Sequence, residues 1–257
     1  MRSSRVLARF RQGQVARVCS LGHYIPSYIA HAARAGYDCV WLDLEHRSLP
    51  PRETEALLLQ CHHHNIDCML RTPTREKAKL YRYLEDGAAG LMIPHVGDAQ
   101  QARELAAAVK FPPAGERGLD NAGLDSGYHA QPDAFAYAEA ANRETFLAVQ
   151  IETPEAVEQC EQIVAVKGVD AIFVGPGDLG FRLRQAGDAD GSRLEAAIER
   201  VAAACAAAGK HWGCPAGSRE MLQKRKDQGA RLLANFGEFM HLMDGLREAA
   251  AQFDALN

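Results

Sequence analysis

Eight short apolar segments recur along the chain, and a longer segment with a different period follows each of them. They are Ala16–Leu21, Cys39–Leu44, Asp67–Leu70, Gly90–Ile93, Phe146–Ile151, Ala171–Val174, His211–Cys214 and Arg231–Asn235. Segments of four to six mostly apolar, often β-branched residues predict strands that are buried on both faces, as in a parallel sheet.

The longer segments carry apolar and alanine residues at helical spacing. Several begin with proline or a capping residue, as at Thr153-Pro154, and several are followed by glycine, as at Gly36 and Gly168. The predicted helices include Ile25–Ala35, Glu53–His63, Ala99–Val109, Pro154–Val164, Leu194–Ala208 and Arg219–Gln228. Strands and helices therefore alternate along the chain.

Eight strands alternating with helices predict an α/β fold, a closed (β/α)8 barrel, which typically takes about 250 residues. The chain has 257 residues, so we expect one barrel domain over residues 1–257 and no second domain. A doubly wound open sheet, which normally has fewer strands, is the alternative.

Two segments fall outside the repeating pattern. The stretch from Phe111 to Gln131 is rich in proline and glycine and precedes a helical segment at Pro132–Asn142. A loop of this length in a compact domain is usually functional. The basic N-terminus, Met1–Gln14, weakly resembles a transit peptide. We interpret it instead as a short helix that covers the bottom of the barrel.

Composition excludes several classes of protein. The net charge is −4 and no dense Lys/Arg block occurs, which argues against a nucleic-acid partner. No apolar run approaches the roughly 18 residues of a membrane span, so no membrane partner is expected. The seven cysteines are an odd number without framework spacing, which indicates free thiols in a reducing compartment. We therefore expect a cytoplasmic enzyme.

The residues at the strand ends carry the candidate chemistry, because ligands bind at the carboxyl ends of strands in parallel α/β folds. Five predicted strands end in polar or conformationally special residues. In chain order these are Asp43, Glu45 and His46; Arg71; Pro94 and His95; Gln150 and Glu152; and Gly175-Pro176-Gly177-Asp178. We expect all of them to face one rim.

Glu152 and Asp178 follow neighbouring strands, so their carboxylates can meet on one cation. Two carboxylates completed by water or substrate oxygens suit Mg²⁺ or Mn²⁺ and a bidentate 2-keto acid. Capping of the helices that follow is the alternative role for both residues. In Gly175–Asp178, glycine permits close backbone approach, and the amides at a helix start can hold a substrate carboxylate.

The candidates for acid–base and electrostatic roles lie at the ends of the second and third predicted strands. A histidine side chain can exchange a proton at physiological pH, so His46 is the candidate proton shuttle, with Asp43 orienting its ring. Arg71 is a fixed cation that can stabilise an enolate or alkoxide. The alternatives are a hydrogen-bonded loop histidine and an ion pair between Arg71 and Glu45.

Six motifs resemble, in order and spacing, the HpcH/HpaI family of class II, metal-dependent pyruvate aldolases. The motifs cover most of the chain: Asp43-Leu44-Glu45-His46, Leu70-Arg71, Gly90–Pro94, Pro112–Gly118, Gln150–Thr153 and Gly168–Leu179. The resemblance implies a barrel whose last helix is swapped between subunits, and a hexamer built as a trimer of dimers.

The resemblance also implies a role for each site residue. A divalent metal (Mg²⁺, Mn²⁺ or Co²⁺) would lie on Glu152 and Asp178, and Glu45 would hold metal-bound water. Asp43 and His46 would form the acid–base dyad, and Arg71 would stabilise the enolate. Gln150 would lie beside the metal, and the amides of Gly177 and Asp178 would hold the pyruvate carboxylate.

Two segments depart from the family pattern. After Arg117-Gly118 the family commonly has small residues ending in Arg-Ala, whereas Leu119–Tyr128 places Asp125 at the expected arginine. Near the last strand, Asn235–Glu238 replaces a Gly/Ser-Asp pair. Because these segments shape the aldehyde pocket, the sequence names neither the aldehyde nor the stereochemistry, metal preference or pathway.

We therefore predict a carbon–carbon lyase that joins or cleaves a pyruvate-like enolate and an aldehyde. The alternatives are oxaloacetate decarboxylation or phosphoenolpyruvate-mutase-like chemistry on the same metal site, and a non-catalytic barrel that binds keto acids.

Overall fold

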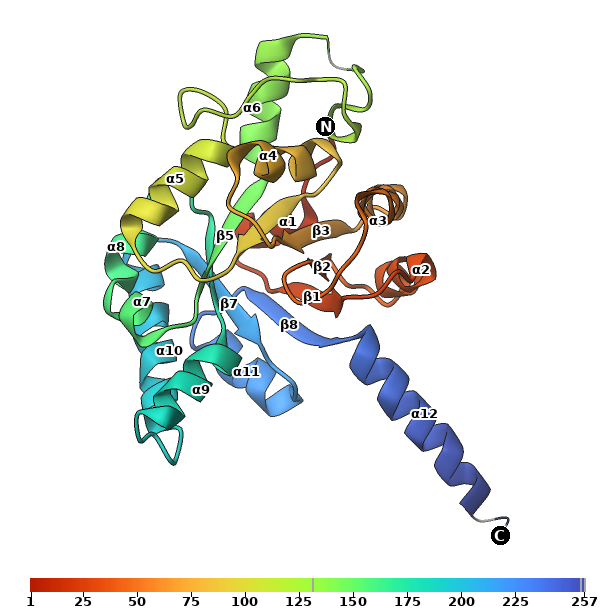
Figure 1. Cartoon of the computed structure of the whole chain (residues 1–257), viewed down its shortest axis with the longest axis vertical. Coiled ribbons are helices and arrows are strands. Elements are labelled where there is room, and N and C mark those ends of the chain that lie inside the picture. The colour runs from red at the N-terminus through yellow and green to blue at the C-terminus, as the bar shows by residue number, and fades with distance from the viewer. Residues whose placement is uncertain (131, 255, 257) are drawn as a thin grey trace.

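Eight parallel strands close into a barrel in the computed structural model, which describes residues 1–130, 132–254 and 256 (Figure 1). The strands are β1 (Ala16–Leu21), β2 (Cys39–Asp43), β3 (Asp67–Arg71), β4 (Gly90–Ile93), β5 (Phe146–Ile151), β6 (Ala171–Val174), β7 (His211–Pro215) and β8 (Leu232–Gly237). Each strand pairs with the next in sequence, and β8 pairs with β1. The predicted (β/α)8 barrel is confirmed, and the open sheet is excluded because no edge remains between β8 and β1.

Helices follow the strands and form the outer layer. They are α1 (Arg5–Arg11), α2 (Pro26–Arg34), α3 (Pro51–His63), α4 (Lys77–Glu85), α5 (Ala99–Val109), η1 (Leu124–Ser126), α6 (Ala134–Glu144), α7 (Pro154–Glu158), α8 (Cys160–Val164), α9 (Pro176–Gln185), α10 (Ser192–Ala207), α11 (Arg219–Asp227) and α12 (Glu238–Asp254). Side-chain caps start several of them, as where Thr153 accepts from the Ala156 amide at 3.1 Å. The helix predicted at Pro154–Val164 is two helices that meet at Gln159.

Two main apolar clusters form the core of the described residues, and a small third cluster contains Phe111, Tyr137 and Ala141. The larger one lies between the strands and the surrounding helices. The smaller one fills the barrel interior, where Trp41 packs edge-on against Phe173 at a ring distance of 5.4 Å. Val6 and Phe10 of α1 belong to this interior cluster, so the predicted N-terminal helix does cover the bottom of the barrel. The functional residues are left to the opposite rim.

The long loop before α6 is fixed by a buried ion pair. Asp125 accepts from Arg117 at 3.0 Å and from the Tyr137 hydroxyl at 2.6 Å. The Arg117 guanidinium also lies over the Phe111 ring. Asp125, which stands where the family pattern has arginine, therefore holds this loop against α6. The last residue of the predicted loop, Gln131, lies outside the described residues.

The last helix, α12, runs away from the barrel (Figure 1). Phe239, Leu242, Leu246 and Phe253 on this helix are exposed. A mostly apolar groove of about 410 Å³ lies on the barrel between α2 and α11, against β1 and β8, and Tyr37, Leu222 and Leu233 help line it. The position between β8 and β1 that an eighth helix fills in a closed (β/α)8 barrel is thus left open.

A search of the described residues for membrane spans finds no helix with both the length and the hydrophobicity needed to cross a bilayer.

Candidate active site

The predicted site residues of β2, β3 and β5 meet at the carboxyl-end rim of the barrel. Asp43 and Arg71 end adjacent strands and stand directly opposite each other in the sheet register. Glu152 follows β5, and Gln150 is the last inward-facing residue of that strand before it. Because inward-facing residues alternate along a strand, residues 41 and 43 on β2 and residues 150 and 152 at β5 point into the barrel.

Arg71 is held by two carboxylates and an aromatic ring. Its Nε and Nη2 donate to the two oxygens of Asp43 at 3.0 and 2.7 Å. Its Nη1 lies 3.0 Å from Glu45 Oε2. The guanidinium carbon lies 4.7 Å from the centroid of the Trp41 ring, in cation–π contact. Trp41 was not among the site residues expected from the sequence. The ion pair with Glu45 that was the alternative for Arg71 is therefore present, alongside a closer pair with Asp43.

Asp43 is ionised as a consequence of these contacts. Burial by itself raises the pKa of Asp43, but the hydrogen bonds and charge of Arg71 and the amides of His46 and Glu45 outweigh it, so the pKa is lowered. The Asp43 carboxylate thus fixes both the guanidinium and the backbone turn that carries Glu45 and His46.

Glu152 is the most deeply buried acid of the rim, with 1% of its surface exposed. Gln150 Nε2 donates to its Oε2, and Gly175 lies directly beside that oxygen, because a Cβ at position 175 would stand 2.6 Å from it. Burial raises the pKa of Glu152, the His95 contacts lower it, and the charges of Glu45 and Asp178 raise it further, for a net increase. Glu45 and Asp178 are thus close enough to Glu152 to concentrate carboxylate groups at this rim.

His95 contacts both Glu152 and Glu45, which follow different strands. Its backbone N–H donates to Glu152 Oε1 at 2.7 Å, and its ring Nδ1 lies 2.8 Å from the same oxygen. Its Nε2 lies 3.0 Å from Glu45 Oε1. The sequence analysis placed His95 at the end of the fourth strand but gave it no role. The rule that selected Arg71 and Glu152, a polar residue at the end of a buried strand, also applies to His95, which Pro94 separates from β4.

His46 lies farther out on the rim, and its side chain is about half exposed. Its Nε2 is 3.6 Å from Glu45 Oε2, while the carboxylate of Asp43 is bound to Arg71. Asp43 contacts His46 through the His46 backbone amide, at 3.4 Å. In this structure the side-chain partner of His46 is therefore Glu45, and the Asp43–His46 dyad stays a prediction.

Asp178 and Gly177 lie in the first turn of α9 and are exposed. Asp178 is close enough for its charge to raise the pKa of Glu152. Backbone N–H groups in a first helical turn have no intrahelical acceptor, so the amides of Gly177 and Asp178 are available to an anion. A Cβ at Gly177 would meet nothing within 4 Å, so this turn is open to a ligand.

The residues present fit a hard divalent cation. Among residues 1–130, 132–254 and 256, no group of three or more His, Cys, Asp and Glu side chains is arranged as a metal site. A cation here would thus take two carboxylates, Glu152 and Asp178, and complete its shell with water or substrate oxygens. The Oε1 atom of Gln150, beside Glu152, is buried without a hydrogen-bond partner in the described structure. Such an orphaned acceptor fits a nearby hydrated cation.

The altered segment at the end of β8 and the start of α12 anchors the rim on the β1 side. Glu238 is buried and accepts from the Gly22 amide and from His23 Nδ1, both at 2.8 Å. These bonds tie the loop after β1 to the start of α12. The departure from the family pattern at Asn235–Glu238 therefore has a structural role in positioning one wall of the rim.

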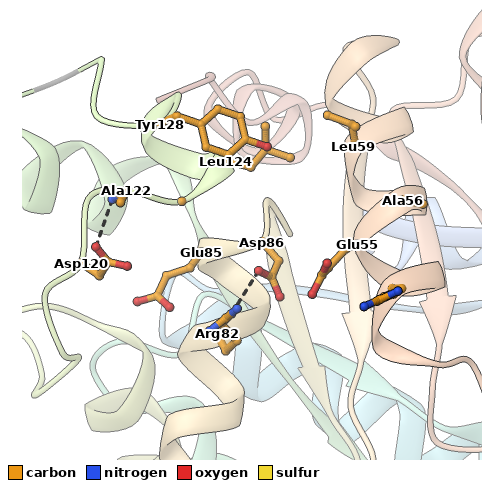
Figure 2. A pocket seen from close by; sticks show the side chains of 12 residues that line it. Glu55, Ala56, Leu59, Arg82, Glu85, Asp86, Asp120, Ala122, Leu124 and Tyr128 are labelled. Carbon is orange, nitrogen blue, oxygen red and sulfur yellow. Dashed lines mark hydrogen bonds and ion pairs between the residues drawn. The ribbon is translucent and has the colours of Figure 1, made fainter.

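A cavity of about 500 Å³ lies away from this rim, among α3, α4 and the segment around residues 120–128 (Figure 2). It is lined by Glu55, Glu85, Asp86 and Asp120, and Arg82 pairs with Asp86 at 3.2 Å. Burial raises the pKa values of Glu85 and Asp86. The lining residues come from α3, α4 with the turn after it, and the loop before α6, and none of them is a predicted site residue.

Comparison with known proteins agrees with this geometry. The family model for HpcH/HpaI aldolase/citrate lyase matches residues 21–234. A hydroxypyruvate/pyruvate aldolase of Delftia acidovorans is 36% identical over 207 residues, covering 79% of this chain and 74% of that protein. A 4-hydroxy-2-oxo-heptane-1,7-dioate aldolase of Shigella sonnei is 31% identical, covering 87% and 84%.

A solved structure gives the same fold. The HpcH/HpaI aldolase of Desulfitobacterium hafniense superposes with a TM-score of 0.89 at 28% identity, covering 96% of this chain and 95% of that one. The matched region spans β2 to β7 in full, together with the last residue of β1 and the first three residues of β8. The family model covers most of the chain, and the closed barrel and the quoted motifs agree with it. The chain therefore belongs to the HpcH/HpaI aldolase/citrate lyase family.

Proposed function

We propose that this protein is a metal-dependent class II aldolase that joins or cleaves a pyruvate-like 2-keto acid enolate and an aldehyde. The observation that carries the proposal is the pairing, across one rim, of an anchored cation with a buried carboxylate. Arg71 is held by Asp43 and Glu45, and Glu152 is held by Gln150 and His95. Enolate chemistry needs positive charge at the enolate oxygen and a chelating site for the keto acid.

Glu152 and Asp178 are the proposed metal ligands, with Mg²⁺, Mn²⁺ or Co²⁺ as the cation. A cation bound to the keto acid acts as a Lewis acid that makes the C3 proton removable. Glu45 lies between Arg71, His46 and His95, where it can accept hydrogen bonds from water on that cation. Gln150 lies against Glu152 on β5 and would contact the keto acid from the barrel interior.

Arg71 and the start of α9 are the proposed substrate contacts. Two of the five N–H groups of Arg71 donate to Asp43, and Nη1 lies 3.0 Å from Glu45, so N–H groups on the terminal nitrogens remain for the enolate oxygen. The amides of Gly177 and Asp178 would hold the pyruvate carboxylate. These contacts orient the keto acid with its methyl group toward the open rim.

His46 is the proposed acid and base for the aldol hydroxyl. Its ring is half exposed and lies on the solvent side of Glu45, where an aldehyde would enter. Asp43 holds the turn that carries His46 and would orient its ring in the complex with substrate. Proton transfer by a positioned imidazole near neutral pH fits this place.

A parallel assay of three reactions tests the proposal. The protein, with Mg²⁺, Mn²⁺ or Co²⁺, is given pyruvate with hydroxylated and semialdehyde acceptors, oxaloacetate alone, and pyruvate alone in D₂O. Aldol product together with exchange of the pyruvate methyl protons supports the aldolase. Oxaloacetate consumption without aldol product indicates a decarboxylase, and keto-acid binding without exchange indicates a non-catalytic barrel.

We further propose a single-domain subunit in a cytoplasmic hexamer, built as a trimer of dimers. The support for assembly is α12, whose exposed apolar face lies off the barrel, and the apolar groove between α2 and α11. A swapped α12 from a second copy has the length and hydrophobicity to cover that groove. The support for a reducing compartment is that all seven cysteines are buried free thiols. Sedimentation velocity of the full chain distinguishes a hexamer from a monomer.

A further inference from the structure

His95 makes an unusually complete set of contacts for a residue on a loop. Its amide and its ring Nδ1 converge on one oxygen, Glu152 Oε1, at 2.7 and 2.8 Å. In its protonated form the ring places positive charge directly beside this oxygen, at ion-pair distance. The ring then continues to Glu45 Oε1, 3.0 Å from Nε2, so a single side chain spans both acids.

The backbone around His95 is fixed to make this possible. His95 has a φ of 56°, in the left-handed region that non-glycine residues rarely adopt. Arg75 donates to the carbonyls of both Pro94 and His95, at 3.1 and 2.5 Å. The next residue, Val96, donates to the Gln150 carbonyl at 3.3 Å. A strained residue persists only where its surroundings determine it, and here they aim one amide and one ring at Glu152.

These contacts decide which part of Glu152 is left for a cation. A carboxylate has about four lone-pair positions, two on each oxygen. The His95 amide and ring Nδ1 lie against Oε1 at 2.7 and 2.8 Å and shield that oxygen, whereas Oε2 accepts from Gln150 Nε2 alone among the described residues. The open position is therefore on Oε2, the oxygen that lies against Gly175 at the start of the segment leading into α9. Asp178 is in the first turn of that helix.

We propose that His95 is a positioning residue that holds Glu152 so that only Oε2 is presented to the divalent cation. It acts through Glu152 and does not itself ligate. The inference rests on the proposed function, because it assumes the Glu152–Asp178 cation site. Carboxylates that bind a metal are commonly held by a neighbouring group, and the inference assigns that role to His95. Loss of such a group typically weakens metal affinity by about 10- to 100-fold.

The test is direct binding of Mn²⁺ to the chelator-treated full-length protein without substrate, by titration calorimetry. His95→Ala removes the ring contacts, and we expect binding about 10- to 100-fold weaker than in the parent. His95→Asn tolerates the left-handed backbone and places an amide N–H where Nδ1 stands, so we expect binding within about threefold of the parent. His63→Ala, an exposed change at the end of α3, serves as the control and should bind as the parent does.

Turnover separates positioning from a direct role in the reaction. With enough Mn²⁺ to saturate His95→Ala, turnover should return to within about threefold of the parent, since the defect lies in metal affinity. Pulsed EPR of bound Mn²⁺ should show no directly coordinated imidazole nitrogen. A coordinated nitrogen that disappears in His95→Ala would overturn the positioning role, as would a kcat that stays low at saturating metal.

Two outcomes distinguish this inference from the function on which it rests. If the parent binds no Mn²⁺, or Glu152→Gln binds it equally well, the proposed site fails and His95 has nothing to position. If binding depends on Glu152 but His95→Ala binds as tightly as the parent, or more tightly, only the inference on His95 is wrong.

Discussion

The guanidinium of Arg71 lies at the centre of the rim, between two carboxylates and above an indole ring. In Arg71→Ala we expect turnover to fall by about 10²- to 10³-fold, the cost of removing one stabilising donor from a developing oxyanion. The fold should survive, because Arg71 ends its strand and lies outside the apolar clusters. Steady-state kinetics and circular dichroism on one preparation check both statements.

Arg103→Ala is the matched control for that variant. Arg103 is an exposed arginine of α5 that contacts Gln100 on its own helix, so its loss should leave turnover unchanged. Unchanged turnover in Arg71→Ala would show that the arginine serves only its ion pairs. Loss of folding in Arg71→Ala would also show that the arginine has a structural role alone.

His46 separates two reactions that share one metal site. Aldol cleavage needs a base for the hydroxyl, whereas oxaloacetate decarboxylation has no hydroxyl to deprotonate. In His46→Ala, aldol cleavage should fall by about 10²- to 10⁴-fold, the range for loss of a general base, and decarboxylation should fall much less. Both rates are measured with one batch of enzyme at saturating metal. Equal losses would assign His46 to the enolate or to the architecture of the rim.

Much of the site was predictable at this scale because a parallel barrel brings all strand ends to one rim. That rule placed Asp43, Arg71 and Glu152 correctly relative to their strands. It could not predict side-chain partners, which depend on rotamers and loop dihedrals. His95 could be placed after its strand, but its left-handed φ and its contact with Glu152 cannot be read from neighbouring residues.

At the scale of elements, a partly buried ion pair joins α10 to α11. Glu195 accepts from both terminal nitrogens of Arg225, at 2.7 and 2.8 Å. The side chain of Arg225 is only 6% exposed, whereas that of Glu195 is 28% exposed. Glu195→Gln would leave a buried guanidinium without its charge partner. We expect a loss of about 1–3 kcal/mol in the free energy of unfolding at pH 7, less than for a fully buried pair because Glu195 is partly hydrated.

The pH dependence of this loss follows from the pKa of Glu195. The hydrogen bond from Arg225 is the main cause that lowers this pKa from 4.5 to about 2. A lowered acid pKa stabilises the fold above the unfolded value, and the benefit disappears as pH falls through the folded value. The stability difference between parent and Glu195→Gln should therefore be full above pH 4.5 and shrink toward pH 2.

Urea unfolding across that pH range measures the difference. Glu161→Gln is the comparison, because its pair with Arg200 is about half exposed on both sides and should contribute no more than about 1 kcal/mol. A Glu195→Gln deficit that stays constant between pH 7 and pH 3 would contradict the account.

The strands were predicted within one or two residues at each end because buried strands are short apolar runs between clear punctuation. Helices were less exact. The interruption at Gln159 between α7 and α8 has no glycine or proline to mark it, and apolar spacing continues through it. Periodicity reports which face is buried and does not report a local change in backbone dihedrals.

At the scale of the whole molecule, the last helix is the feature that bears on the proposed assembly. Under the proposed helix swap, α12 would pack on a second copy of the chain. The apolar groove between α2 and α11 is open, and the exposed leucines and phenylalanines of α12 are away from it. The barrel was therefore predictable from the alternation of strands and helices, whereas the swap of the last helix was expected from the family resemblance alone and stays a prediction.

In the proposed function, Glu152 and Asp178 hold a cation that makes a pyruvate-like keto acid acidic at C3. The most direct measurement is exchange of the pyruvate methyl protons in D₂O, followed by ¹H NMR in chelator-treated protein with and without added Mg²⁺, Mn²⁺ or Co²⁺. Because two carboxylates bind a divalent cation only moderately tightly, chelation should remove it. We predict that exchange is lost on chelation, is restored by added cation in the parent, and is not restored in Glu152→Gln. Exchange that persists in the chelated protein, or that returns in Glu152→Gln as it does in the parent, would contradict the account.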